Sequence, residues 1–200
     1  VSVAQLSQVQ KNIIGGFSSN SEAILGTGTI TVNGTEIEVT AENNSLLGLA
    51  KSINELSATT GVQVSIINDG KEANPYHLVF TGKDAQSSFT IESTLGVTVP
   101  GDLDFTTSQV QTAQQAVAII DGITVVSNTN TITDAISGVT LNLNSVNDTI
   151  SAGTPETDVD PWDWEDPPVY ETARLDIQAD TGALKEKVTS FVTAYNDVME

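Results

Sequence analysis

The sequence predicts an α+β fold that is predominantly antiparallel β, and three observations support this class. Two dipeptides that favour tight turns, Asn33-Gly34 and Asp121-Gly122, each stand between segments of alternating apolar residues. Only one segment among these strands, residues 45–56, has apolar residues at helical spacing. We therefore expect a small α+β module inserted in a β-rich domain, followed by a C-terminal helix.

The composition limits the classes of function. The chain has 200 residues, with 7 Lys and Arg against 26 Asp and Glu, a formal net charge of −19 at pH 7. This charge repels nucleic acids and anionic membranes, and no apolar run approaches the roughly 20 residues that span a bilayer. The absence of cysteine excludes disulfides, thiolate metal sites and cysteine nucleophiles. We therefore expect no nucleic-acid partner and no membrane insertion.

The first elements are a strand, a linker and a hairpin. Residues 1–10 alternate weakly and favour an edge strand, while the Gly- and Ser-rich residues 15–22 are predicted to form a linker. Residues 26–39 are predicted to form a hairpin with a type I′ turn, because both central positions of that turn need positive φ. This turn places Ile30 opposite Ile37, so one face of the hairpin is apolar.

Residues 45–56 are predicted to form an amphipathic helix with Ser45 as its N-cap. The apolar face consists of Leu46, Leu49, Ala50, Ile53 and Leu56. Gly48 within this helix costs about 1 kcal/mol relative to alanine, so we expect a close neighbour there. Strands are predicted at 62–67, 77–82 and 88–93, which completes a β-β-α-β-β-β unit over residues 26–98.

A second unit, mostly antiparallel β, begins near Gln111. It contains the predicted hairpin at Asp121-Gly122 and then a break at Gly138. The strand after this break has Val139, Leu141 and Leu143 on one face. If the first strand of the chain joins this sheet, the first unit is an insertion within the second.

These elements give the expected domains. Residues 1–20 and 104–180 are expected to form a β-rich framing domain, and residues 21–103 the inserted α+β domain. An acidic insertion at 151–172, rich in proline, is expected to leave the sheet before a strand at 173–180. Residues 181–200 begin a further helical domain, with Leu184, Val188, Phe191, Val192 and Tyr195 at helical spacing. Because the chain starts with Val and this helix has little to pack on, we expect an excised fragment.

No arrangement of residues predicts a catalytic, cofactor or metal site, so we do not expect an enzyme. The only histidine, His77, stands in a predicted strand, where packing is a more common role than catalysis. The acidic run 158–166 lacks the ligand oxygen and the glycine that a calcium loop needs at its fifth and sixth positions, which favours a solvated loop. Within it, Trp162 and Trp164 either anchor a partner or fold back onto the sheet.

Two stretches resemble proteins of the bacterial flagellum. Residues 26–85 resemble the flagellin IN motif, which is named for an Ile-Asn pair matched here by Ile53-Asn54. Residues 113–143 are similar to the start of the C-terminal region of the flagellar hook-associated protein 2 family, the filament-capping proteins. The matching positions are Asp121-Gly122, Ser127-Asn128-Thr129, Thr133-Asp134 and Gly138-Val139-Thr140-Leu141. Residues 1–11 and 191–198 resemble a strand and a helix of the same family, whereas 151–172 depart from its pattern.

The resemblance implies two tip domains and the start of a helical leg domain. It implies a structural filament-cap protein that promotes the insertion and folding of flagellin at the distal end of the flagellum. The implied partners are flagellin and other flagellar axial proteins, and full-length copies would form a ring. The implied location is extracellular, at the flagellum tip, after export through the flagellar channel.

Two other functions stay open at this point. One is a variable domain of another flagellar axial protein, either a hook-associated protein or a flagellin, although the match at 127–141 argues against it. The other is a surface adhesin or glycan-binding module, in which Trp162 and Trp164 form a stacking platform for a host or surface glycan.

Overall fold

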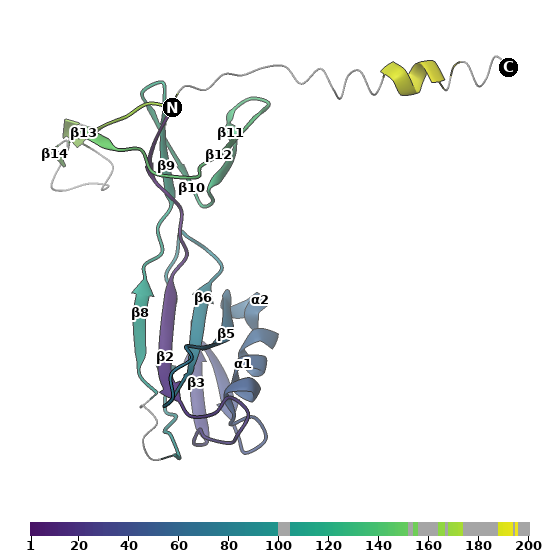
Figure 1. The fold of residues 1–200 in the computed structure, drawn as a ribbon, viewed down its shortest axis with the longest axis vertical. Helices are drawn as coiled ribbons and strands as arrows, with labels where there is room; N and C mark the ends of the chain where they lie inside the picture. Colours follow the sequence, from purple (N-terminus) through teal and green to yellow (C-terminus); the bar gives the residue numbers. More distant parts are fainter. Residues whose placement is uncertain are drawn as a thin grey trace.

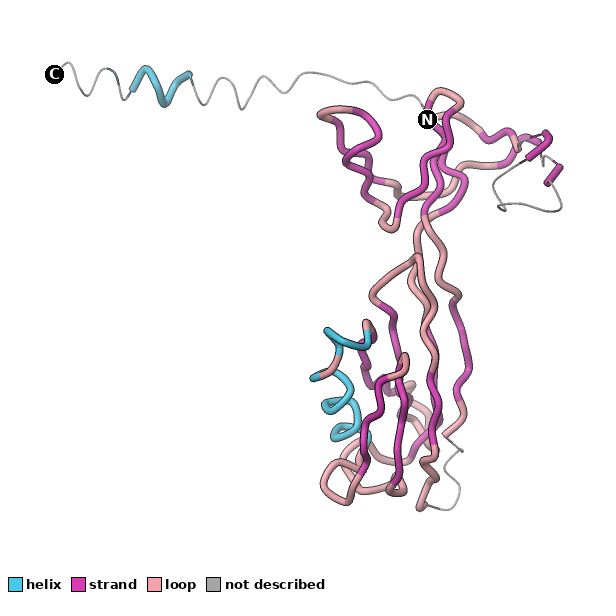
Figure 2. Tube along the Cα trace, turned by 180° about the vertical axis from the view of Figure 1, so that it is seen from behind, coloured by secondary structure: helices cyan, strands magenta, loops and turns pink. Residues whose placement is uncertain are grey.

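The computed structural model describes residues 1–99, 105–151, 154–155, 164–166, 168–173, 188–193 and 195. The chain forms two units joined by a narrow neck (Figures 1 and 2). The helix-bearing unit comprises residues 11–99 and 105–111, the hairpin unit residues 1–5 and 116–143, and the neck residues 6–10 and 112–115. The β-rich α+β class predicted from the sequence is confirmed.

The larger sheet of the helix-bearing unit has four antiparallel strands in the order β5-β6-β2-β8. These strands are β2 (Lys11–Phe17), β5 (Val62–Asn68), β6 (Tyr76–Gly82) and β8 (Thr107–Gln111). In the central strand β2, Ile14 pairs with Leu78 of β6 and with Thr107 of β8. The predicted linker at 15–22 is therefore wrong for residues 15–17, which stay in β2 because the ring of Phe17 is fully buried.

The smaller sheet of this unit has the order β4-β3-β7 and contains the predicted hairpin. Its strands are β3 (Gly28–Val32), β4 (Thr35–Val39) and β7 (Ile91–Ser93). Ile30 pairs with Ile37, and the turn residues Asn33 and Gly34 have φ angles of 48° and 79°. These positive angles are the ones that a type I′ turn needs, so the hairpin prediction is confirmed.

Helix α1 (Leu46–Glu55) confirms the predicted helix and its N-cap. The backbone N–H of Gly48 donates to the Ser45 hydroxyl at 3.0 Å. A Cβ on Gly48 would lie 2.7 Å from the backbone oxygen of Asn43, and this close approach explains the glycine. Leu46, Leu49, Ala50 and Ile53 are buried. Leu56 is 36% exposed because it follows the last turn of α1, so its predicted place on the buried face is wrong.

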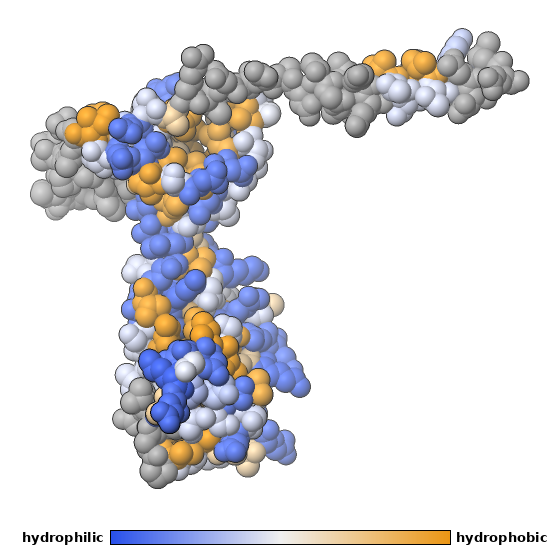
Figure 3. All heavy atoms as spheres, viewed as in Figure 1, coloured by the Kyte–Doolittle hydropathy of each residue, from blue (hydrophilic) through white to orange (hydrophobic). Residues whose placement is uncertain are grey.

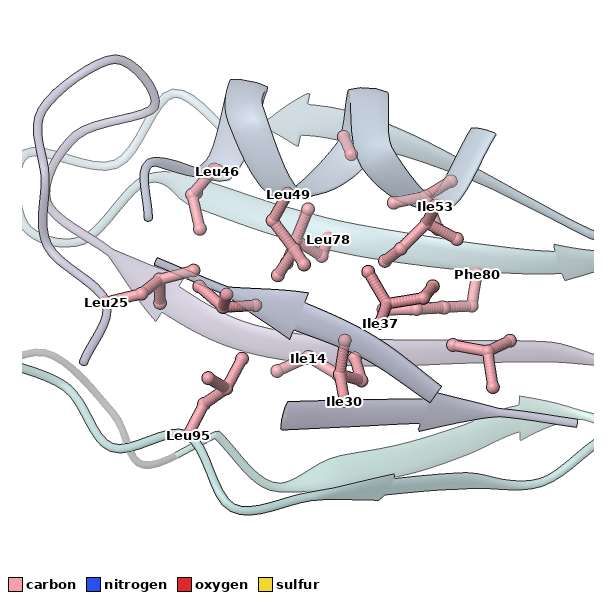
Figure 4. Packing of buried hydrophobic residues seen from close by; sticks show 14 of the residues in the cluster. Ile14, Leu25, Ile30, Ile37, Leu46, Leu49, Ile53, Leu78, Phe80 and Leu95 are labelled. Carbon is pink, nitrogen blue, oxygen red and sulfur yellow. The ribbon is translucent and has the colours of Figure 1, made fainter. Parts of the chain in front are cut away.

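The core of the helix-bearing unit lies between α1 and the two sheets (Figure 4). Its fully buried side chains include Ile14, Phe17, Ile30, Leu46, Leu49, Ile53, Leu78 and Phe80. Burial of each such side chain contributes about 1.5–3 kcal/mol, so this shared core is the main source of stability. A short helix that the sequence did not predict, α2 (Ser57–Thr60), follows α1 and ends at Gly61 with φ 68°.

The hairpin unit contains a three-stranded antiparallel sheet in the order β1-β9-β10. Its strands are β1 (Ser2–Gln5), β9 (Ala116–Ile120) and β10 (Ile123–Ser127). Asp121 and Gly122 have φ angles of 50° and 83°, and Ile120 pairs with Ile123, which confirms the second hairpin. Ser2 of the first strand pairs with Ile119, so the chain between them leaves this sheet and returns to it.

A second hairpin in this unit is formed by β11 (Thr131–Ile136) and β12 (Val139–Asn142), with Gly138 in its turn at φ 76°. Its apolar residues complete a small separate core with the first sheet. This core consists of Val3, Ala116, Ala118, Ile120, Ile132, Leu141 and Leu143. The strand predicted after Gly138 is therefore confirmed, and its apolar face is the buried one.

The predicted excursion at 151–172 contains two short ladders. β13 (Thr149–Ser151) pairs with β16 (Val169–Tyr170), and β14 (Thr154–Pro155) pairs with β15 (Trp164–Asp166). Such ladders need only hydrogen bonds between two backbones. The proline-rich, acidic composition of this segment, which is unsuited to a buried core, therefore does not prevent them. Trp162 lies outside the described residues, as do the aspartates at 158, 160 and 163, and for Trp164 only the backbone is described.

The C-terminal segment is helical at residues 188–193 and 195. Leu184 and, apart from Ala173, the strand predicted at 173–180 lie outside the described residues. The apolar stripe at Val188, Phe191, Val192 and Tyr195 is exposed, and part of it is visible in Figure 3. Within the described part of the chain, no helix combines the length and the apolar character needed to cross a bilayer.

Candidate functional site

The Ile53-Asn54 pair has two distinct structural roles at the C-terminal end of α1. Ile53 is fully buried in the core of the helix-bearing unit. The side-chain amide of Asn54 points the other way, to the outer edge of β5. Its Oδ1 accepts from the backbone N–H of Val64 at 2.7 Å, and its Nδ2 donates to the carbonyl of Val64 at 2.8 Å. Asn54 thus occupies the place that a neighbouring strand would take.

An open strand edge exposes unpaired backbone groups and invites pairing with another chain. We expect Asn54→Ala to lower the free energy of unfolding by about 2 kcal/mol, because it leaves the N–H and C=O of the buried Val64 without partners. Urea unfolding followed by circular dichroism measures this loss, and hydrogen exchange should show faster exchange at Val64.

The matched control is Gln63→Ala on the same strand, since the Gln63 side chain is exposed. It should change the free energy of unfolding by less than about 0.5 kcal/mol. Equal stability of the two variants would contradict the role given to Asn54.

The turn residues named from the sequence differ in what they contact. Asn33 donates from Nδ2 to the carbonyl of Thr60 at 3.0 Å, which fastens the first hairpin to the end of α2. Gly34, Gly122 and Gly138 have open space where a Cβ would stand, so only their positive φ accounts for glycine. These residues shape the backbone and present no reactive group.

The Ser127-Asn128-Thr129 motif lies at the junction between the hairpin unit and the neck. The carbonyl of Asn128 accepts from the Ser7 hydroxyl at 2.7 Å, and its Oδ1 accepts from Gln115 Nε2 at 2.7 Å. Its Nδ2 donates to Gln86 Oε1 of the helix-bearing unit at 3.4 Å. Asn128 of the hairpin unit therefore contacts both the neck and the helix-bearing unit. The carboxylate of Asp134 accepts from the hydroxyl of Thr133 at 2.9 Å.

Sequence reasoning missed Asn130, which holds the neck beside Asn128. Its Oδ1 accepts from the backbone N–H of Ser7 at 2.6 Å, and its Nδ2 donates to the carbonyl of Ser7 at 3.0 Å. This is the arrangement seen between Asn54 and Val64. The asparagine-rich stretch 128–130 was the only available signal, and it does not say which strand edge an asparagine would reach.

A polar cleft of about 450 Å³ opens at the same junction. Its lining includes Asn33 and Thr60 of the helix-bearing unit and Asn128 and Thr129 of the hairpin unit, with Lys83 beside them. Amides and hydroxyls of this kind form hydrogen bonds, and the carboxylate of the lining, Asp84, accepts from the backbone N–H of Gln86 at 2.8 Å. Among the residues that the structure describes, no group of three or more His, Cys, Asp or Glu side chains could hold a metal ion.

His77 of β6 lies opposite the register irregularity in β2 between Ile14 and Phe17, and its ring stabilises this irregularity by hydrogen bonding. Its Nδ1 lies 2.7 Å from the carbonyl oxygen of Gly15, and its Nε2 lies 3.0 Å from Oδ2 of Asp69. Lys71 binds the same carboxylate, with Nζ 2.7 Å from Oδ2 and its backbone N–H donating to Oδ1 at 3.0 Å. These contacts give the histidine a structural role at the irregularity in β2.

The hydrogen bonds from Lys71, with a smaller contribution from His77, hold the pKa of Asp69 far below the usual range of an aspartate. A lowered pKa means that the charged carboxylate stabilises the fold above about pH 4 and that this contribution is lost as the pH falls. We expect Asp69→Asn to be less stable than wild type at pH 7, with a difference that shrinks toward pH 3. Urea unfolding of both proteins at pH 7 and pH 3 measures this difference, and an equal difference at the two pH values would contradict the prediction.

Comparison with known proteins places these features in a family. The model of the flagellin hook IN motif matches residues 26–84, and the model of the flagellar hook-associated protein 2 C-terminus matches residues 113–200. The A-type flagellar hook-associated protein 2 of Pseudomonas aeruginosa is 28% identical, over 98% of this chain and 42% of its own length. The chain is similar along almost its whole length to a protein of the flagellar hook-associated protein 2 family.

Further relatives and solved structures show the same similarity. A flagellar hook-associated protein 2 of Campylobacter jejuni is 25% identical, over 87% of this chain and 29% of its own length. The crystal structure of the flagellar cap protein FliD from Bdellovibrio bacteriovorus has a TM-score of 0.57 at 26% identity, covering 72% of this chain and 84% of that one. FliD (HAP2) from Pseudomonas aeruginosa PAO1 shares the fold, with a TM-score of 0.55 at 23% identity, over 100% of this chain and 87% of that one.

The chain spans less than half the length of the two hook-associated protein 2 relatives. The IN-motif match contains Asn33, Gly34, Ile53 and Asn54, and the C-terminal match contains the second hairpin, Asn128, Asp134 and Gly138. The named motif residues therefore lie in the two β-rich units and at the junction between them.

Proposed function

We propose that this chain is the tip portion of a filament-cap protein, which sits at the distal end of the bacterial flagellum and promotes the insertion and folding of flagellin. The observation that carries the proposal is the joint presence of an IN motif at 26–84 and a hook-associated protein 2 C-terminus at 113–200 in one chain. The IN motif alone would also fit another flagellar axial protein, but the second match favours the cap.

The physical character of the chain supports a structural role. Both units are stiffened by antiparallel pairing, type I′ turns and asparagine side chains that close strand edges. Such a protein keeps its shape without disulfides, and a chain without cysteine can be exported unfolded through a narrow channel. We propose that it works through its surfaces and is not an enzyme.

The proposal includes partners, place and domains. Flagellin and the other flagellar axial proteins would be the partners, full-length copies would assemble into a ring, and the site of action would be extracellular. We place the domain boundaries in the neck, because β2 and β8 pair within the helix-bearing unit. The inserted domain then includes β2 and β8 in addition to the range 21–103 expected from the sequence.

Complementation tests this function. The full-length protein, expressed in a strain that lacks its own filament cap, should restore filaments and swarming and should stop the leakage of flagellin monomers into the medium. Immunoblotting of the medium and of sheared filaments checks that the protein is exported. If exported, full-length protein leaves flagellin leaking as in the empty-vector control, the capping function is wrong.

A further inference from the structure

The two strands that cross the neck keep one antiparallel register from the hairpin unit to the helix-bearing unit. Backbone pairs recur at every third residue, namely Gln5 with Val117, Gln8 with Gln114 and Lys11 with Gln111. At the central pair, the N–H of each residue donates to the carbonyl of the other at 2.9 Å. Between these pairs the backbone ladder is interrupted, which leaves backbone carbonyls for other donors.

Four glutamine side chains, two from each strand, donate to carbonyls on the opposite strand. The contacts are Gln5 Nε2 to Gln115 O at 2.7 Å, Gln8 Nε2 to Thr112 O at 3.3 Å, Gln111 Nε2 to Val9 O at 2.6 Å, and Gln114 Nε2 to Leu6 O at 3.0 Å. The pattern is reciprocal, since each strand both gives and receives two of these bonds.

We propose that these four glutamines form a clasp that fixes the orientation of the hairpin unit relative to the helix-bearing unit. An isolated two-stranded connection is marginally stable in water, so a neck without further bonds would bend and twist. The amide of glutamine has the reach to span an interrupted ladder, and it donates without adding charge. The neck strands contain no charged residue between positions 6 and 10 or between 112 and 115, in a chain of net charge −19.

The clasp is braced from one side. Asn130 closes the free backbone edge of Ser7 within the neck, and Asn128 binds both the neck and Gln86. These contacts join the neck to residues 128–130 of the hairpin unit and to Gln86 of the helix-bearing unit. They therefore support the same relative orientation of the two units as the clasp does. The inference concerns the stiffness of the molecule and does not depend on the capping function.

Distance measurement between two spin labels tests the clasp directly. The chain has no cysteine, so Lys51→Cys on α1 and Asp134→Cys on β11, both exposed, would carry the only labels. The tested variant replaces Gln5, Gln8, Gln111 and Gln114 by methionine, which keeps side-chain length and removes the donor. Gln63→Met, on an exposed position of β5, is the matched control.

With both labels in place, the otherwise unchanged protein and Gln63→Met should each give one narrow distance distribution by pulsed electron paramagnetic resonance. The fourfold variant should give a distribution about twice as wide, because the two units then move independently. Hydrogen exchange at residues 62–68 and 116–120 checks that both units stay folded. If they do not, the double variant Gln8→Met, Gln114→Met is measured instead. An unchanged width in a folded variant would overturn the proposal.

Discussion

Replacing Gly15 by alanine is expected to lower the free energy of unfolding by about 3 kcal/mol. Gly15 has a φ of +83°, where an L-residue is strained by about 1–2 kcal/mol. A Cβ there would also lie 2.0 Å from the ring of Phe17. That ring is fully buried and packs near Phe105, with ring centroids 6.4 Å apart, so it cannot move aside without opening the core.

The control for Gly15→Ala is Gly34→Ala. Gly34 has a similar φ of +79°, but nothing lies within 4 Å of the position of its Cβ. It should therefore lose only the strain energy, about 1 kcal/mol. Urea unfolding gives both values, and the chemical shifts of Phe17 and Phe105 should move in the first variant alone. Equal losses would mean that the close packing of Phe17 on Gly15 has no energetic weight.

Replacing Ile53 by alanine is the second large change, and it is expected to cost about 2–5 kcal/mol. Ile53 is fully buried and packs from α1 into the core beside Ile37 and Phe80 (Figure 4). Removing its side chain leaves a cavity that the two sheets and the helix cannot close completely. Denaturant unfolding, with hydrogen exchange of β5 and β6, should show the loss in the helix-bearing unit.

Leu56→Ala provides the comparison, because Leu56 continues the same helical spacing but stands beyond the end of α1 with 36% exposure. We expect it to cost less than about 1 kcal/mol. A similar loss for both variants would show that the helix extends its buried face past Glu55 in solution. The pair thus tests the boundary of the helix as well as the core.

Local features of this fold could be predicted from the sequence because their causes are local. The Asn-Gly and Asp-Gly turns need positive φ at adjacent positions, and few other residue pairs supply it. Helix α1 combines a serine cap with apolar residues at helical spacing. The close approach at Gly48 could also be expected, because a glycine within a helix otherwise only lowers the stability of that helix.

The course of β2 could not be predicted in the same way. Residues 15–17 have the composition of a linker, yet they lie in the sheet because Tyr76 of β6, more than 50 residues away, pairs with Phe17. The irregularity there depends on Phe17, Gly15 and His77 together. The secondary structure of such a stretch depends on pairing with distant segments, which cannot be predicted from local composition.

The junction residues were only partly predictable. The motif drew attention to Asn128, but the role of an asparagine depends on which strand edge its side chain reaches. For Asn54 this depends on the packing of α1 on β5, and for Asn130 on the packing of the β10–β11 connection on the neck. Two of the neck glutamines, Gln5 and Gln8, lie in the edge strand expected at residues 1–10, whereas Gln111 and Gln114 lie on the returning strand. The pairing of these side chains with carbonyls on the opposite strand follows only from the register of two segments about a hundred residues apart.

The central proposal is that this chain belongs to a structural part of the flagellum at its far end. Immunogold electron microscopy tests it most directly, with antibodies raised against this chain and applied to intact cells of the organism that encodes it. The account predicts gold particles at the distal ends of the filaments and none on cells in which the gene is deleted. Gold distributed along the filament shaft, or confined to the cell body, would contradict it.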